Sequence, residues 1–323
     1  MQTDVTRLLG IDLPIVQSAM SWASSNATLP AAVSAAGGLG TLAVGPMRLP
    51  QIEEAVADIR RRTDRPFAVN LPLYRKGADE VMDLLARLRI PILVASQGGP
   101  QAYLDRFQAL GTICVHTVSS VRHAEKAAIA GVDALVVVGG EAGGHPPADL
   151  VSGHVMLRAV KRALPQMPII SAGGWADGAG LIAALSLGAG AIAMGTRFLT
   201  CPEATVPEAY KARVLSAGVG DTRVVGRGFG VIRALRNEFT DRMEALERDA
   251  ASETERGTVF RGTTLKDVVL DGMIDSGKLE AGQSAGLVDV AIPAAQVVEE
   301  VARDASETLA RLVGSQDGSG LTL

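Results

Sequence analysis

Residues 134–145 read ALVVVGGEAGGH, which is an apolar run followed by a glycine-rich turn and one histidine. The apolar run has the length and composition of a strand that is buried on both faces. Glycines in the turn let the backbone approach a ligand closely and expose its N–H groups. His145 adds a side chain that exchanges protons near neutral pH. The stretch therefore predicts a buried strand that ends at a cofactor site with acid–base chemistry beside it.

Short apolar runs of the same kind recur along the chain, with helical segments between them. Amphipathic spacing marks the helices, as in Ile52, Val56 and Ile59. Eight such strands joined by helices, at about 25 residues per unit, favour a closed (β/α)8 TIM barrel, and a doubly wound parallel sheet is the alternative. The predicted strands are 13–17, 38–43, 67–71, 91–95, 112–116, 133–138, 168–172 and 190–194, and the predicted helices are 27–36, 50–62, 78–89, 100–109, 120–130, 151–164 and 177–187.

The pattern changes after residue 200. Residues 203–216 suit the eighth barrel helix, whereas residues 217–275 read as polar and helical. A loop and then a terminal helix with Val297, Val298 and Val301 follow at 283–314, and residues 314–323 read as a frayed tail. We therefore predict a barrel at 1–216, a helical subdomain at 217–275 that covers the barrel mouth, and a segment at 276–323 that returns to the barrel.

Composition excludes several classes of protein. The 323 residues are 47% hydrophobic and carry a formal charge of −4, which gives no electrostatic basis for binding nucleic acid. The N-terminus does not read as a signal peptide, and no apolar run reaches the ~18 residues of a spanning helix. Cys114 and Cys201 show neither a disulfide framework nor metal-ligand spacing. We expect no membrane contact, no metal, and a reducing cytoplasm. The oligomeric state stays open, a homodimer included.

Two late strands end in glycines. The strand before residue 173 runs into Gly173-Gly174, and the next strand runs into Gly195-Thr196. In barrels, the loops after strands seven and eight frequently bind a phosphate through backbone N–H groups. The alternative is that these glycines only form tight turns. Asp177 follows the first pair and is placed to cap the next helix.

The histidines differ in what their positions suggest. His145 is the candidate acid–base group, and a loop histidine with a purely structural role is the alternative. His116 ends the predicted fifth strand and is a second candidate, whereas His123 and His154 read as helix-surface residues. Glu141 either orients the turn by accepting backbone hydrogen bonds or is an exposed carboxylate.

Two further positions at strand ends offer ligand contacts. Asn70 ends a strand with an amide that can recognise the edge of a heterocyclic ring, or that forms an Asx turn before Pro72. Met20 follows the first strand and lies beside the mouth, although core packing is the more usual role of a methionine. Residues 226–230, GRGFG, lack the glycine spacing and the βαβ unit of a dinucleotide loop, and we discount them.

These residues, in this order, resemble the nitronate monooxygenase family of FMN-dependent barrels (2-nitropropane dioxygenase-like). The family includes FMN-dependent enoyl-ACP reductases and NADH:quinone reductases. The resemblance runs from about Leu9 to Val288. The segments that carry it are GIDLPIVQ at 10–17, AGGLG at 36–40, DRPFAVN at 64–70, EAGGH at 141–145, SAGG at 171–174, DG at 177–178, MGTRF at 194–198 and AGQ at 281–283.

The resemblance implies non-covalent FMN at the carboxyl-terminal mouth of a TIM barrel. His145 would be the catalytic acid–base group above the flavin. The ring would be lined by Ala19, Met20 and Asn70, the phosphate end would be held by Gly143, Gly173, Gly174, Gly195 and Thr196, and Gln283 would reach the flavin region from the C-terminal segment. Residues 217–275 would match the small helical domain that covers the substrate side.

Three positions depart from the family pattern. Val138 stands where many members carry a polar residue, Ser18-Ala19 replaces a usual glycine pair, and Thr117 stands where members that act on quinones often carry lysine. The first functional hypothesis is oxidation of small alkyl nitronates or nitroalkanes to a carbonyl compound and nitrite with O2. The alternative is an NAD(P)H-dependent reductase or dehydrogenase of an enoyl or acyl thioester (ACP or CoA), or an NADH:quinone reductase. A flavin-storing or structural barrel is the non-catalytic hypothesis.

Overall fold

An eight-stranded parallel barrel forms the body of the computed structural model, which describes residues 1–314. The order β1-β8-β7-β6-β5-β4-β3-β2 runs through neighbouring strands without exception, as in a barrel. This confirms the predicted TIM barrel and excludes the doubly wound alternative. The strands are β1 (Ile15–Gln17), β2 (Thr41–Ala43), β3 (Ala68–Pro72), β4 (Ile92–Ser96), β5 (Ile113–Val118), β6 (Ala134–Val138), β7 (Ile169–Ala172) and β8 (Ala191–Met194).

The seam between β1 and β2 closes with help from one buried side chain. A single parallel bridge joins Val16 to Leu39. The amide oxygen of Gln17, which is fully buried, then accepts from the backbone N–H of Thr41 at 2.9 Å. A side chain thus replaces the ladder bond that short β2 cannot supply, and the barrel has no open edge at this point.

Helices surround the barrel and bury their apolar stripes against it. In α3 the buried residues Ile52, Val56 and Ile59 follow helical spacing, as the sequence predicts. The predicted helix 100–109 is instead a 3-10 turn (Pro100–Ala102) followed by a short α-helix. The barrel helices are α2 (Thr28–Ala35), α3 (Leu49–Arg62), α4 (Ala78–Arg87), α5 (Leu104–Gln108), α6 (Val121–Ala130), α7 (Gly153–Ala163), α8 (Gly178–Ser186), α9 (Thr196–Leu199) and α10 (Glu208–Leu215).

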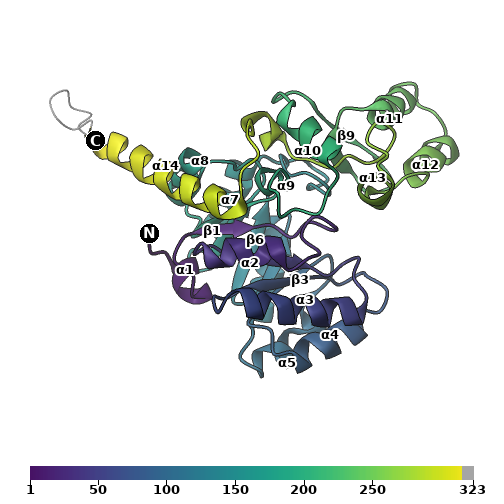
Figure 1. Cartoon of the computed structure of the whole chain (residues 1–323). Helices are drawn as coiled ribbons and strands as arrows, with labels where there is room; N and C mark the ends of the chain where they lie inside the picture. The colour runs from purple at the N-terminus through teal and green to yellow at the C-terminus, as the bar shows by residue number, and fades with distance from the viewer. Residues whose placement is uncertain (315–323) are drawn as a thin grey trace.

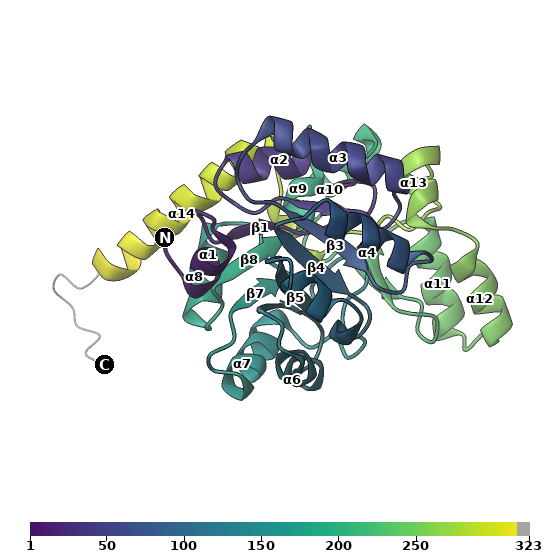
Figure 2. The ribbon, with the colours of Figure 1, turned by 90° about the horizontal axis from the view of Figure 1, so that it is seen from below.

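Two further helices lie at the ends of the chain. Helix α1 (Asp4–Leu9) packs Val5 and Leu9 onto the barrel interior, so it covers the amino ends of the strands (Figure 2). Helix α14 (Ala294–Gly314) lies along α8 and extends past the barrel (Figure 1). The carboxylate of Asp304 accepts from the N–H of Gly178 at 2.8 Å, and Asp177 accepts from Gly180 at 2.7 Å, so α8 is capped from two sides, as predicted for Asp177. The predicted frayed tail at 314–323 lies outside the described residues, except for its first residue.

Residues 217–275 were predicted to be helical, and the structure differs from this prediction in one respect. They begin with an antiparallel hairpin, β9 (Thr222–Val225) and β10 (Ile232–Leu235), which we did not predict. Helices α11 (Glu238–Arg248), α12 (Glu253–Arg261) and α13 (Leu265–Asp271) follow. A small core of their own, which includes Phe239, Met243 and Phe260, holds the hairpin and helices together. Figures 1 and 2 both show these green elements on the side of the barrel opposite α14.

Candidate active site

Most of the predicted site residues lie around the carboxyl ends of β6, β7, β8 and β1. The turn after β6 meets the segment that returns from α13. An added Cβ on Gly143 would lie 2.5 Å from the backbone of Ala281 and Gly282. The N–H of Gln283 donates to the carbonyl of Glu141 at 3.0 Å. Gly143 is therefore required where two distant stretches of backbone touch.

The ends of β7 and β8 present backbone donors without protein acceptors. Within residues 1–314, no protein acceptor bonds the N–H groups of Gly173, Gly174, Gly195 and Thr196. The hydroxyl of Thr196 accepts from Gly282 N–H at 2.9 Å and keeps its own proton to donate. Four unpaired donors at neighbouring strand ends form a cradle suited to an anion such as a phosphate.

The first-strand turn borders the same cradle. The sulfur of Met20 lies 3.5 Å from the position that a Cβ on Gly195 would take, so Met20 stands beside the mouth. Met20 and Ala19 are both half-buried. On the neighbouring side of the barrel, the amide N–H of Asn70 donates to Val94 O at 2.9 Å. This bond crosses to β4 and is not the Asx turn that was the alternative. The amide oxygen of Asn70 has no partner within the described chain.

One acidic and one basic side chain fix the glycine-rich turn. The carboxylate of Glu141 accepts from Gly153 N–H at 2.9 and 3.0 Å, so it caps α7 and orients the turn, which decides between the two readings of Glu141. The buried guanidinium of Arg233 donates to Gly140 O at 2.7 and 3.2 Å and to Thr222 Oγ1 at 3.0 Å. Arg233 belongs to residues 217–275, which were predicted to be polar and helical. Because it lies on β10, it instead ties the hairpin to the turn.

A small antiparallel ladder places His145. Gly144 bridges Arg233, and Ala234 bridges Glu280, so the motif turn, β10 and the returning segment lie side by side. The imidazole of His145 is exposed at the surface of this ladder. The surrounding protein partly desolvates it, and this desolvation, together with the charge of Lys278, lowers the pKa of His145. At neutral pH the imidazole is therefore a base.

His116, the second candidate, lies away from this site. It is buried on the outer face of β5, where its Nδ1 is 2.9 Å from the hydroxyl of Tyr103. Burial lowers the pKa of His116, which leaves it neutral between sheet and helices. Its neighbour Val115 instead faces the barrel interior. Residues alternate between the two faces of a strand, and this parity places His116 outside. His123 and His154 are exposed on α6 and α7, as expected.

Comparison with known proteins is consistent with this geometry. A family model described as nitronate monooxygenase matches residues 2–87 and 75–304. The chain belongs to the nitronate monooxygenase family. It is 33% identical to a (3aS,4S,5R,7aS)-5-hydroxy-7a-methyl-1-oxo-octahydro-1H-indene-4-carboxyl-CoA dehydrogenase of Mycobacterium tuberculosis, over 94% of this chain and 96% of that protein. It is 30% identical to a nitronate monooxygenase of Paraburkholderia phytofirmans, over 94% and 95%.

A solved structure of the same family superposes over almost the whole chain. FabK from Thermotoga maritima matches with a TM-score of 0.90 and 35% identity, over 98% of this chain and 99% of that one. Members of the nitronate monooxygenase family are flavin-dependent oxidoreductases, and this chain is an oxidoreductase of that family. No described helix is both long and apolar enough to cross a bilayer. Residues 1–314 contain no cluster of side chains that could hold a metal ion.

Lys278 and Glu280 are the charged groups at this family site that the sequence analysis missed. They stand two residues apart, with the buried Leu279 between them, on the segment that returns from α13 to the barrel. Burial raises the pKa of the Glu280 carboxyl to about 7. The signal that could have found them is this polar–apolar–polar alternation directly before Ala281-Gly282-Gln283.

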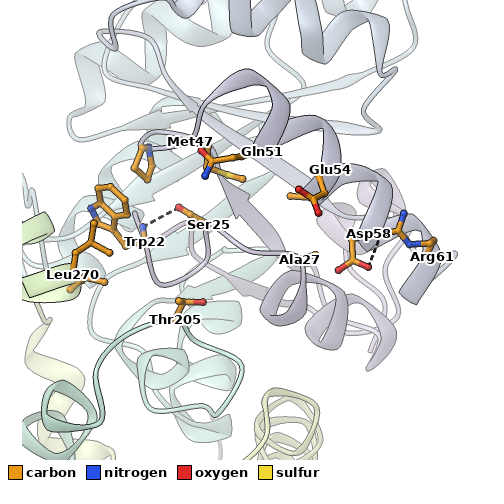
Figure 3. A pocket seen from close by; sticks show the side chains of 13 residues that line it. Trp22, Ser25, Ala27, Met47, Gln51, Glu54, Asp58, Arg61, Thr205 and Leu270 are labelled. Atoms are coloured by element: carbon orange, nitrogen blue, oxygen red, sulfur yellow. Dashed lines mark hydrogen bonds and ion pairs between the residues drawn. The ribbon is translucent and has the colours of Figure 1, made fainter.

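A surface groove opens beside the first-strand turn. It has a volume of ≈ 520 Å³ and runs between α3, the turn that holds Trp22, and α13. Figure 3 shows Trp22, Met47, Gln51 and Leu270 around one end and Glu54, Asp58 and Arg61 along the other. Trp22 follows Met20 by two residues, but none of the predicted site residues lines the groove.

Proposed function

We propose that the chain binds FMN non-covalently at the carboxyl-terminal mouth. The four unpaired N–H groups of Gly173, Gly174, Gly195 and Thr196 support a phosphate at the ends of β7 and β8. Ala19, Met20 and Asn70 would line the ring, and the free amide oxygen of Asn70 suits a ring N–H. Gly143 would hold the turn close enough to complete the cradle, and Gln283 would approach from the returning segment.

We further propose that the substrate is a small alkyl nitronate or nitroalkane, which is oxidised to a carbonyl compound and nitrite with O2. The bound flavin would supply the electron transfer between substrate and dioxygen. His145 would take the α-proton of a neutral nitroalkane, and a nitronate, which has already lost that proton, would not need this step. The observation that carries the proposal is the set of free N–H groups at the ends of β7 and β8, with the turn that leads to His145 packed against Gly173.

Anaerobic mixing tests the proposal directly. The purified protein should be yellow, and propyl nitronate should bleach its flavin under argon. Admission of air should then restore the colour and release nitrite. A protein that takes up no FMN, or whose flavin stays oxidised with propyl nitronate, would remove this function.

A second function is supported by the 33% identity to the Mycobacterium tuberculosis CoA dehydrogenase. In that case the substrate would be an acyl or enoyl thioester of CoA or ACP, and NADH or NADPH could serve as electron donor. A thioester needs room for a long arm, and we propose that the surface groove beside Trp22 would take this arm. Bleaching by NAD(P)H or by a thioester, with none by propyl nitronate, would favour this function. Thr117 in place of a family lysine speaks against a quinone.

We also propose a cytoplasmic location, because Cys114 and Cys201 are both free thiols buried in the core. Burial raises the pKa of each thiol to about 12, so neither is reactive as a thiolate.

A further inference from the structure

Lys278 holds an unusual position for a lysine. Its ammonium lies 3.7 Å from the centroid of the Phe260 ring and 6.0 Å from that of Phe239. No carboxylate oxygen lies within salt-bridge distance of it in the described part of the chain. The positive charge therefore rests on aromatic faces and is not neutralised by a direct partner.

The aromatic platform is fixed. Phe260 is nearly buried and stacks on Phe229, with ring centroids 5.7 Å apart. It also packs so closely against Gly226 that a Cβ there would lie 2.2 Å from the ring. A charge that sits on such a ring has a defined place in the fold.

The same segment reaches the mouth two residues later. Glu280 bridges Ala234, whose neighbour Arg233 bridges Gly144, the residue before His145. The hydroxyl of Tyr210 donates to the carbonyl of Glu280 and anchors the segment from α10. The position of Lys278 is thus tied to the position of His145 through one ladder.

We propose that Lys278 is a positioning residue of the mouth, a fixed positive charge that keeps His145 as a neutral base and draws anionic substrates toward it. The proposal rests on the proposed function for the role of His145. It goes beyond that function by assigning the mouth a preference for anions, and it identifies the residue responsible.

The groups that face Lys278 do not cancel its charge. Desolvation lowers the pKa of Lys278, whereas Glu280 on its own segment and Asp267 on α13 raise it. Burial raises the pKa of Glu280 to about 7, so this carboxyl is neutral in the range where His145 titrates. Hydrogen bonds from Thr264 lower the pKa of Asp267, but that carboxylate is committed to the start of α13. The positive charge of Lys278 still acts on His145, because it lowers the pKa of that imidazole.

The test measures the ionisation of His145 without flavin or substrate. The apoprotein is modified with diethyl pyrocarbonate between pH 4.5 and 8.5, and the rate at His145 is followed by peptide mass spectrometry. Lys278→Met should raise the midpoint of this profile by about half a pH unit or more. Lys278→Arg should restore it, and Lys266→Met, which removes the same charge from an exposed site on α13, should leave it unchanged. An unmoved midpoint in Lys278→Met would overturn the proposal.

A second variant keeps the proposal open to refutation if Lys278→Met does not fold. Glu280→Gln should leave the His145 midpoint where it is, because the native carboxyl is already neutral there. A downward shift would show that an ionised Glu280 neutralises Lys278, which contradicts the proposal. Since neither measurement involves a substrate, a failure of nitronate oxidation and a failure of this inference are distinguishable.

With the holoenzyme, Lys278→Met should raise KM for propyl nitronate, an anion, about tenfold or less, while KM for neutral nitropropane stays within twofold. Equal changes for both substrates would contradict a role in attracting anions.

Discussion

The partly buried side chain of Glu280 is expected to make the free energy of unfolding depend on pH. Its pKa rises from the usual 4.5 to about 7 in the folded chain, chiefly through burial. The folded state therefore holds a proton that the unfolded state releases between these values. Stability from this group is fully present below pH 4.5 and is lost as the pH rises through 7, at a cost of about 3 kcal/mol if each pKa unit is worth about 1.4 kcal/mol.

Glu280→Gln should remove this dependence because glutamine has the same shape and does not ionise. The free energy of unfolding of the variant, minus that of the wild type, should increase by about 3 kcal/mol between pH 4.5 and 8. Urea unfolding of the apoprotein, followed by tryptophan fluorescence at half-unit pH steps, measures this difference. A difference for Glu280→Gln that stays constant across the range would refute the assigned burial of the carboxyl.

Three further changes test other parts of the structure. Gly143→Ala places a Cβ 2.5 Å from the returning backbone, so FMN affinity measured by flavin fluorescence should fall at least tenfold, whereas Gly220→Ala, in open space, should not change it. His145→Ala should slow flavin reduction by nitroalkanes by ~10²–10⁴-fold in stopped-flow absorbance while leaving FMN affinity intact. Gly178→Ala brings a Cβ to 2.0 Å from the backbone of α14, and calorimetry should show a loss of roughly 1–3 kcal/mol; an unchanged melting temperature would contradict the tight α8–α14 contact.

The barrel was predictable because each strand is an apolar run that needs burial on both faces. Strands β1 to β8 all begin and end within a few residues of their predicted bounds. The hairpin was not predictable in the same way. Its strands, TRVV and IRAL, are short, and each contains one arginine. Arg233 can be buried because the carbonyl of Gly140, 93 residues earlier, accepts a hydrogen bond from it. Such a partner is visible only in three dimensions.

The candidate site likewise contains residues that could be predicted from the sequence and residues that could not. Glycines at the ends of β6, β7 and β8 could be found from the sequence, since each directly follows an apolar run. Their roles toward FMN remain predictions. The role of His116 stayed open because a position at a strand end does not specify a face, and a shift of one residue separates the barrel interior from the helix layer. Lys278 and Glu280 escaped notice because their environment is built from α12, β10 and α10 together.

Two parts of the candidate site come from different parts of the chain, and this can explain how members of one family differ in substrate. The N–H donors at the ends of β7 and β8 belong to residues of the barrel. The other part of the site contains His145, Lys278 and Glu280. Its arrangement depends on the pairing of β10 with the glycine-rich turn and with the returning segment. Substitutions in residues 217–280 can therefore alter the charge and shape around His145 while the N–H groups at the ends of β7 and β8 stay in place. Relatives of this chain that are named for different substrates, a nitronate monooxygenase and a CoA dehydrogenase, are consistent with this division of the site.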